Sequence, residues 1–103
     1  MFIIVDGDKD YNNYDNFVMI MSKLKDTMLV SDHEFTIFCT GPDNIFSLVK
    51  KIYDDNSFID KRIKFYNNAQ ENVEKYGYAR FKYNVYFGNN IYVKDSNGDI
   101  INV

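Results

Sequence analysis

Residues 1–11 read MFIIVDGDKDY, and this stretch decides the fold that we expect for the chain. An apolar run of strand type over residues 2–5 ends at Gly7, which lies between two carboxylates. A segment of helical periodicity begins just after Asn12 and Asn13. A buried strand that leads through a polar, glycine-containing turn into a helix is typical of parallel α/β domains. Such domains bind ligands at this turn, because the carboxyl edge of the sheet meets a helix N-terminus there.

The rest of the chain continues this alternation of strands and helices. Apolar residues at helical spacing predict helices over residues 14–28, 45–53 and 69–76, and apolar runs predict strands over residues 35–39, 63–66 and 85–87. The Asn97-Gly98 pair predicts a terminal hairpin with strands at 91–94 and 100–103. We therefore expect one α/β domain over residues 1–103: a small Rossmann-like parallel sheet flanked by helices, with a C-terminal β-hairpin.

Two of the helices begin beside residues whose side chains accept hydrogen bonds from backbone amides. Asn13 or Asp15 is expected to cap the first helix, and Asp43 or Asn44 the second. Each polar turn follows the end of its strand in the same way. Both turns are therefore expected at one edge of the sheet.

Composition narrows the classes of function. The chain has 103 residues and a formal net charge of −3, which argues against duplex nucleic acid as a partner. No apolar run approaches the roughly 18 residues that span a membrane, and no signal-peptide pattern is visible, so we expect a cytoplasmic protein without a membrane partner. The single cysteine, Cys39, excludes an internal disulfide and a cysteine-based zinc site. We expect no resident metal.

Three stretches are similar to motifs of a known family. Residues 7–11, Gly-Asp-Lys-Asp-Tyr, stand where that family has Gly-Ser-Arg and then an Asp-Tyr pair. Residues 40–43, Thr-Gly-Pro-Asp, stand where its second strand ends in Ser-Gly-Gly-Ala-x-Gly-x-Asp. Residues 71–84 are similar to a segment that begins roughly Asp-Trp-x-x-Tyr-Gly and ends in Arg-Asn. Over about residues 2–90, the chain thus resembles the SLOG superfamily, in its YspA-like branch.

This resemblance implies a Rossmann-like domain that binds a nucleotide or nucleotide-derived ligand without catalysing a reaction. The implied contacts are Gly7, Asp8 and Lys9 of the first loop, Thr40, Gly41 and Asp43 of the second loop, and Arg80. Lys9 would balance phosphate charge, and Asp43 would cap its helix or bind a ribose hydroxyl. The second loop has one glycine where the family has several, and Pro42 supplies no amide, so fewer N–H groups are available to a phosphate.

The residues leave two other interpretations open, of which the first is an enzyme. The Asp-Gly-Asp of residues 6–8, together with Thr40, also resembles the start of a haloacid-dehalogenase phosphatase. In that family the first Asp attacks phosphorus, the second acts as acid and base, and Mg²⁺ lies between them. Residues 88–89, Gly-Asn, stand where that family has Gly-Asp, which argues against this enzyme.

The other interpretation is an interaction module with a degenerate pocket. A tyrosine-rich face around Tyr76, Tyr78, Tyr83 and Tyr86 would then bind a host protein, or a second copy of the chain to form a homodimer. Asn, Asp, Tyr and Ile are frequent and Lys is favoured over Arg, which suggests an AT-rich genome. We interpret the chain as an accessory protein of a phage or mobile element that modulates a host process.

Overall fold

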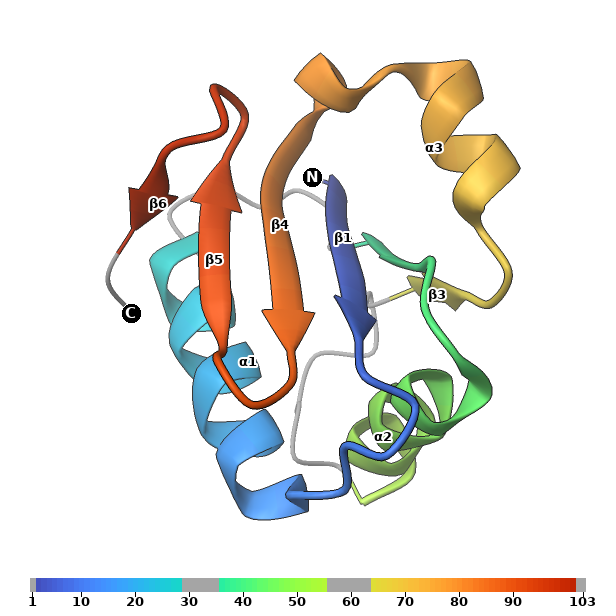
Figure 1. Ribbon diagram of the computed structural model, residues 1–103, viewed down its shortest axis with the longest axis vertical. Helices are drawn as coiled ribbons and strands as arrows, with labels where there is room; N and C mark the ends of the chain where they lie inside the picture. Colours follow the sequence, from blue (N-terminus) through green and yellow to red (C-terminus); the bar gives the residue numbers. More distant parts are fainter. Residues whose placement is uncertain (1, 29–35, 56–63, 102–103) are drawn as a thin grey trace.

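The computed structural model describes residues 2–28, 36–55 and 64–101 (Figure 1). The elements in these ranges are β1 (Phe2–Gly7), α1 (Tyr14–Met28), β2 (Thr36–Cys39), α2 (Asp43–Asp54), β3 (Lys64–Tyr66), α3 (Gln70–Tyr76), the 3-10 helix η1 (Tyr78–Arg80), β4 (Phe81–Phe87), β5 (Tyr92–Asp95) and β6 (Ile100–Ile101). Residues 35, 63, 102 and 103 of the expected strands lie outside the described ranges. Within those ranges, no helix combines the length and apolar character needed to cross a membrane.

The strands form one six-stranded sheet in the order β3-β2-β1-β4-β5-β6. β3, β2, β1 and β4 pair in parallel, whereas β5 and β6 are antiparallel to their neighbours. The expected fold is confirmed: the sheet has a parallel core, helices flank it, and the last two strands form a hairpin around residues 95–99. The arrangement is that of a small Rossmann-like α/β fold.

One strand is longer than the sequence analysis predicts. Residues 85–87 are expected as a strand, but β4 starts at Phe81. Phe81, Tyr83, Val85 and Phe87 are buried, and the residues between them are not. Tyr83, Val85 and Phe87 belong to the main core, whereas Phe81 packs in the smaller core on the other face, because the register of β1 and β4 shifts between Phe2 and Ile3. The sequence analysis predicts only the last three residues of this strand. β4 therefore has the length to pair with all of β1.

Helices cover the two faces of the sheet unequally. Side chains of α1 and α2 form the larger core with β1, β2, β4 and β5, and the residues at its centre include Ile3, Val5, Phe17, Ile45, Val85 and Phe87. On the other face, Ala69 and Val73 at α3 pack on Ile4, Phe38 and Phe81. Because α3 has only seven residues, this second core is small. Part of this face of the sheet therefore carries polar and partly exposed side chains.

The helix starts agree with the expected caps in one case and differ in the other. Asn13 caps α1, because its Oδ1 accepts a hydrogen bond from the Asn16 amide at 3.1 Å. α2 instead has Pro42 at the N-cap position and no side-chain cap, so neither Asp43 nor Asn44 acts as expected. Asn44 does not cap the helix, because its side-chain amide donates to carbonyls of the loop after β1.

The strand order places a topological switch point beside β1. From β1 the chain adds β2 and β3 on one side, and it then returns to add β4 on the other side. Figure 1 shows β1 and β4 side by side, with both arrowheads at the same end. The loops that leave these two strands diverge there, and open α/β sheets bind ligands in the crevice that results.

Candidate functional site

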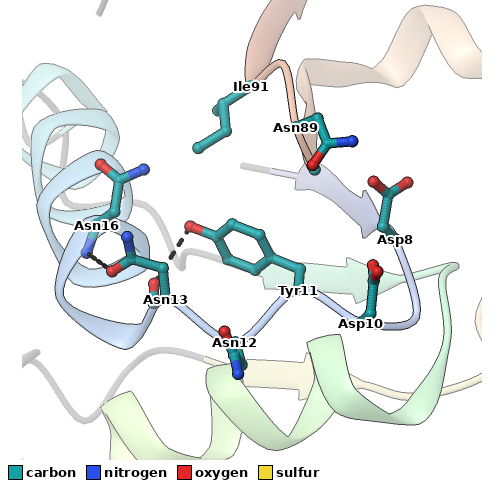
Figure 2. A pocket seen from close by; sticks show the side chains of 9 residues that line it. Asp8, Asp10, Tyr11, Asn12, Asn13, Asn16, Asn89 and Ile91 are labelled. Carbon is teal, nitrogen blue, oxygen red and sulfur yellow. Dashed lines mark hydrogen bonds between the residues drawn. The ribbon is translucent and has the colours of Figure 1, made fainter.

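A pocket of about 400 Å³ lies at this switch point. Its walls come from the β1–α1 loop, the first turn of α1 and the β4–β5 loop (Figure 2). The lining residues are Asp8, Asp10, Tyr11, Asn12, Asn13, Asn16, Gly88, Asn89 and Ile91. The volume is within the range of about 300–1,000 Å³ found for small-molecule sites.

Hydrogen bonds from two neighbouring elements fix the β1–α1 loop. The Asp8 amide donates to the Phe87 carbonyl at 2.8 Å, which ties the loop to the end of β4. The Asn44 side-chain amide donates to the carbonyls of Asp8 and Tyr11, both at 3.0 Å. The Tyr11 amide donates to the Asp8 carbonyl at 3.1 Å and closes a turn. The pocket wall is therefore held from β4 and from α2.

Two glycines that are expected to contact the ligand have neighbours that leave no room for a Cβ. A Cβ on Gly7 would lie 2.4 Å from the Phe87 carbonyl oxygen and 2.6 Å from Cδ1 of Ile45. A Cβ on Gly41 would lie 2.4 Å from Oδ1 of Asp6. Real Cβ atoms do not approach other heavy atoms this closely. Only glycine at position 7 lets the end of β1, β4 and α2 converge, and glycine at position 41 lets its loop approach Asp6.

Asp8 is positioned by a tyrosine from β4. The Tyr86 hydroxyl donates a hydrogen bond to Oδ1 of Asp8. This bond raises the pKa of Tyr86 to about 12, with further contributions from burial and from the nearby carboxylates of Asp8 and Asp6. Tyr86 also stacks on Tyr92 of β5, with ring centroids 5.3 Å apart and planes 6° apart. Tyr86 therefore stays protonated near neutral pH and orients the Asp8 carboxylate.

The charges in the pocket are negative. Asp8 and Asp10 line it, and none of the described lining residues is Lys, Arg or His. Asp15 adds a third carboxylate in the first turn of α1. Two amides at this helix start are engaged, because the Asn16 amide donates to Oδ1 of Asn13 and the Phe17 amide donates to the Asn13 carbonyl. The pocket therefore suits hydroxyl and amine donors, whereas phosphate would be repelled.

The other end of the pocket is neutral. Figure 2 shows the ring of Tyr11 between the carboxylates of Asp8 and Asp10 and the side chains of Asn13 and Asn16. The Tyr11 hydroxyl donates to the Asn13 carbonyl at 3.2 Å. Burial raises the pKa of Tyr11. Carboxamides offer both donors and acceptors, so this end can bind the polar edge of a neutral ligand.

The structure brings only part of the sequence-predicted set to this pocket. Asp8 lines it, Gly7 lies behind it, and Lys9 is an exposed neighbour that does not line it. Thr40 continues the pairing of β1 and β2, since its amide donates to the Val5 carbonyl at 3.1 Å. Thr40, Gly41 and Asp43 share the same edge of the sheet, but they lie beside the pocket rather than in its lining.

Asp43 and Arg80 have other surroundings. Oδ1 of Asp43 accepts a hydrogen bond from the side chain of Asn67 at 3.3 Å. Arg80 precedes β4 and so lies at the opposite edge of the sheet from the pocket, where Figure 1 shows the short helix before β4. Its guanidinium carbon is 5.5 Å from the ring centroid of Tyr76 and 5.9 Å from that of Phe2. The structure therefore does not bring Arg80 together with Asp8 and Lys9.

Residues of two loops line the pocket although the sequence analysis does not predict them as site residues. Asn12, Asn13 and Asn16 line the pocket, and the asparagine-rich segment after the first strand was the available signal for them. Asn89 and Ile91 come from the β4–β5 loop. This loop adjoins the first one because β4 pairs with β1. In the sequence, only the comparison with phosphatases, which concerns residues 6–8 and 88–89, relates the two loops.

The residues of the phosphatase interpretation do not form a metal site. Oδ1 of Asp6 accepts the Gly7 amide at 2.7 Å and abuts Gly41, and Asp6 does not line the pocket. Asp8 is bound by Tyr86. In the part of the chain that the structure describes, no three His, Cys, Asp or Glu side chains are grouped so that they could hold a metal ion.

No family model, curated protein or solved structure matches this chain. The resemblance to the SLOG superfamily therefore stays a prediction.

Proposed function

We propose that this protein binds a nucleotide-derived ligand without catalysis, and that the pocket at the switch point receives the nucleoside part of that ligand. The observation that supports this proposal is the pocket itself: about 400 Å³, at the edge where β1 and β4 end, with mainly polar side chains in its lining. Nucleosides offer ribose hydroxyls and a base with a polar edge. Both find chemical partners in this lining.

The two ends of the pocket differ in what they recognise. The carboxylates of Asp8 and Asp10 accept hydrogen bonds from a ribose diol, as acidic residues do in many dinucleotide-binding sites. The amides of Asn13 and Asn16 fit the donor and acceptor pattern of a base, and the ring of Tyr11 lies between these two ends. A phosphate on the ligand remains outside the pocket, too far from the carboxylates for a hydrogen bond but close enough to be repelled by them.

Catalysis is not part of the proposal. Covalent catalysis by a hydroxyl, thiol or amine needs that nucleophile within hydrogen-bond reach of a base. The described lining offers no Ser, Thr, Cys, His or Lys for these roles. The Tyr86 hydroxyl donates to Asp8, and its pKa of about 12 keeps it protonated near neutral pH, so it cannot accept a proton there.

Calorimetric titration with the four ribonucleosides and their 5′-monophosphates tests this function. We expect at least one nucleoside to bind, and its monophosphate to bind roughly thirtyfold more weakly, because the costs from Asp8 and Asp10 add to about 2 kcal/mol. Each carboxylate at about 7 Å from a phosphate costs about 1 kcal/mol at an effective dielectric constant near 40. Asp10→Asn should weaken nucleoside binding by roughly fivefold to tenfold, because it removes a charged hydrogen-bond acceptor.

Asp54→Asn serves as the matched control, because it removes the same charge from an exposed position near the end of α2. It should leave nucleoside binding unchanged. The proposal is wrong if no nucleoside binds, or if Asp10→Asn and Asp54→Asn have equal effects. Tighter binding of the monophosphates would also contradict it, since it would place phosphate at a cationic site elsewhere.

Protein interaction is the second candidate function, and the structure changes its expected surface. Tyr83 is only 7% exposed and belongs to the main core, so it is not available to a partner. Tyr76 and Tyr78 are 39% and 54% exposed. A host protein or a second copy of the chain would therefore meet Tyr76 and Tyr78, and native mass spectrometry of the purified protein would show pairing directly.

A further inference from the structure

A second cavity continues the pocket at the switch point towards the C-terminal hairpin. It has a volume of about 340 Å³, and its walls come from α1, the residue before β5, and the strands β5 and β6. Asn16 and Ile91 line both cavities. Figure 2 shows these two residues on the side of the pocket away from Asp10. We call this second cavity the apolar groove.

The apolar groove differs from the pocket in its chemistry. Apart from Asn16 and Tyr92, its described lining consists of Ile20, Ile91, Val93, Ile100 and Ile101, so none of the described lining residues carries a charge. Ile20 and Val93 are buried in the main core and form the floor, whereas Ile100 at the rim remains 68% exposed. A ligand that covers this apolar surface gains free energy, because it removes the surface from water.

The order of chemical groups along the two cavities defines which part of a nucleoside reaches the groove. The carboxylates of Asp8 and Asp10 lie at one end of the pocket, and the groove begins at the other end, beside Asn16. A nucleoside whose ribose binds the carboxylates therefore directs its base towards the groove.

The asparagines limit where the base can carry an apolar substituent. Asn13 and Asn16 bind the polar edge of the base only if that edge stays free. A substituent on an exocyclic amine would occupy the edge. A substituent at C5 of a pyrimidine leaves it free, because the edge consists of N3 and the groups at C2 and C4.

We propose that the ligand is a pyrimidine nucleoside with a short alkyl group at C5, and that the apolar groove binds this group. The inference rests on the proposed function, since the ribose and the polar edge of the base bind in the pocket. The alkyl group packs against Ile20, Ile91 and Ile101, and a groove of about 340 Å³ has room for it.

Three uridines that differ only at C5 test this inference by calorimetric titration: uridine, 5-propyluridine and 5-(2-hydroxyethyl)uridine. The two substituents have nearly the same size and differ in a terminal methyl or hydroxyl group. We expect 5-propyluridine to bind about tenfold more tightly than uridine, because its alkyl carbons leave water in part. The hydroxyethyl compound should bind within about twofold of uridine, because its hydroxyl loses solvation in the groove. In ¹⁵N NMR spectra, the propyl group should add shifts at residues 92–93 and 100–101 to those that uridine causes.

Variants of Ile101 separate the groove from the pocket, because Ile101 lines the groove and not the pocket. Ile101→Asn should remove most of the preference for 5-propyluridine while uridine still binds. Ile101→Val, which keeps a β-branched residue in the strand, should reduce the preference by about twofold. Met19→Ala is the control, because it removes an exposed apolar side chain of α1 that lines neither cavity. It should leave the preference unchanged.

The outcomes distinguish this inference from the proposed function. Equal affinity for uridine and 5-propyluridine, or equal gains from the propyl and hydroxyethyl groups, would overturn the inference while the proposed function stands. Binding of purine nucleosides alone would have the same consequence. Absence of binding by every nucleoside would overturn the proposed function, and this inference with it.

Discussion

A Cβ on Gly7 would meet a backbone atom of β4, so Gly7→Ala gives the sharpest test of the local geometry. The added Cβ would lie 2.4 Å from the Phe87 carbonyl oxygen and 2.6 Å from Cδ1 of Ile45. The Ile45 side chain is fully buried, and the Phe87 carbonyl accepts the Asp8 amide at 2.8 Å. Neither neighbour can move without disturbing the core or the contact between β1 and β4.

Overpacking of a core by one methyl group typically costs about 1–3 kcal/mol, and a clash with backbone belongs at the upper end. We therefore expect Gly7→Ala to lower the free energy of unfolding by about 3 kcal/mol. For a domain of this size that corresponds to a fall in Tm of roughly 12–24 °C. Urea denaturation and thermal unfolding followed by circular dichroism measure both quantities.

Gly98→Ala separates this steric cost from the general cost of replacing glycine. Gly98 has a φ of +85° in the hairpin turn, and a Cβ there would meet nothing within 4 Å. Its replacement should cost about 1 kcal/mol, from backbone conformation alone. A Gly7→Ala variant that is as stable as the wild type, or no less stable than Gly98→Ala, would refute the close packing of β1, β4 and α2 that defines the pocket wall.

Three further predictions concern single groups. Asn44→Ala should destabilise the protein by about 1–2 kcal/mol and speed amide hydrogen exchange in residues 8–11, since its side chain donates to two loop carbonyls; unchanged exchange would contradict this role. The raised pKa of Tyr86 means that its contribution to stability is complete below about pH 10 and is lost as the pH rises towards 12, so ultraviolet titration should show one tyrosine that ionises near pH 12 in wild type but not in Asp8→Asn. Burial raises the pKa of Cys39 to about 12, so alkylation by iodoacetamide at pH 8 should be slow until urea unfolds the chain, and rapid labelling of the native protein would contradict the burial.

The sequence predicted the elements well where the residue pattern was local. The apolar run at residues 2–5 and the helical spacing of Phe17, Met21 and Leu24 are side-chain patterns that follow from burial on one element. The Asn97-Gly98 turn has the same local character, because a positive φ at Gly98 selects the residue. These features did not require knowledge of which strands are neighbours.

The pocket forms only where particular strands are neighbours in the sheet, so its lining residues could be predicted from the sequence only in part. Asp8 was identified because it follows the first strand, where any ligand site of this fold would lie. Arg80 was placed at the site by motif similarity, but it stands before β4 rather than after it, which puts it at the other edge of the sheet. Asn89 follows β4 and lines the pocket, because β4 pairs with β1 in the sheet. It was not predicted as a lining residue, because the residue pattern does not show which strands pair.

The hydrogen bond between Asp8 and Tyr86 could not be predicted from the sequence either. The two residues are 78 positions apart in the chain. Sequence patterns assigned Tyr86 to a surface of tyrosines because four of them are close in sequence. In the sheet, successive residues of β4 point to opposite faces, so Tyr83 enters the core while Tyr86, three positions later, reaches the loop after β1.

The central claim is that ligands bind where β1 and β4 diverge, and ¹⁵N NMR of the wild-type protein titrated with single ribonucleosides tests it most directly. The account predicts saturable shifts that are largest for the amides of residues 8–16 and 88–91, and that are lost in Asp10→Asn. Shifts confined to residues 40–43, or to α3, or the absence of any shift at millimolar nucleoside, would contradict it.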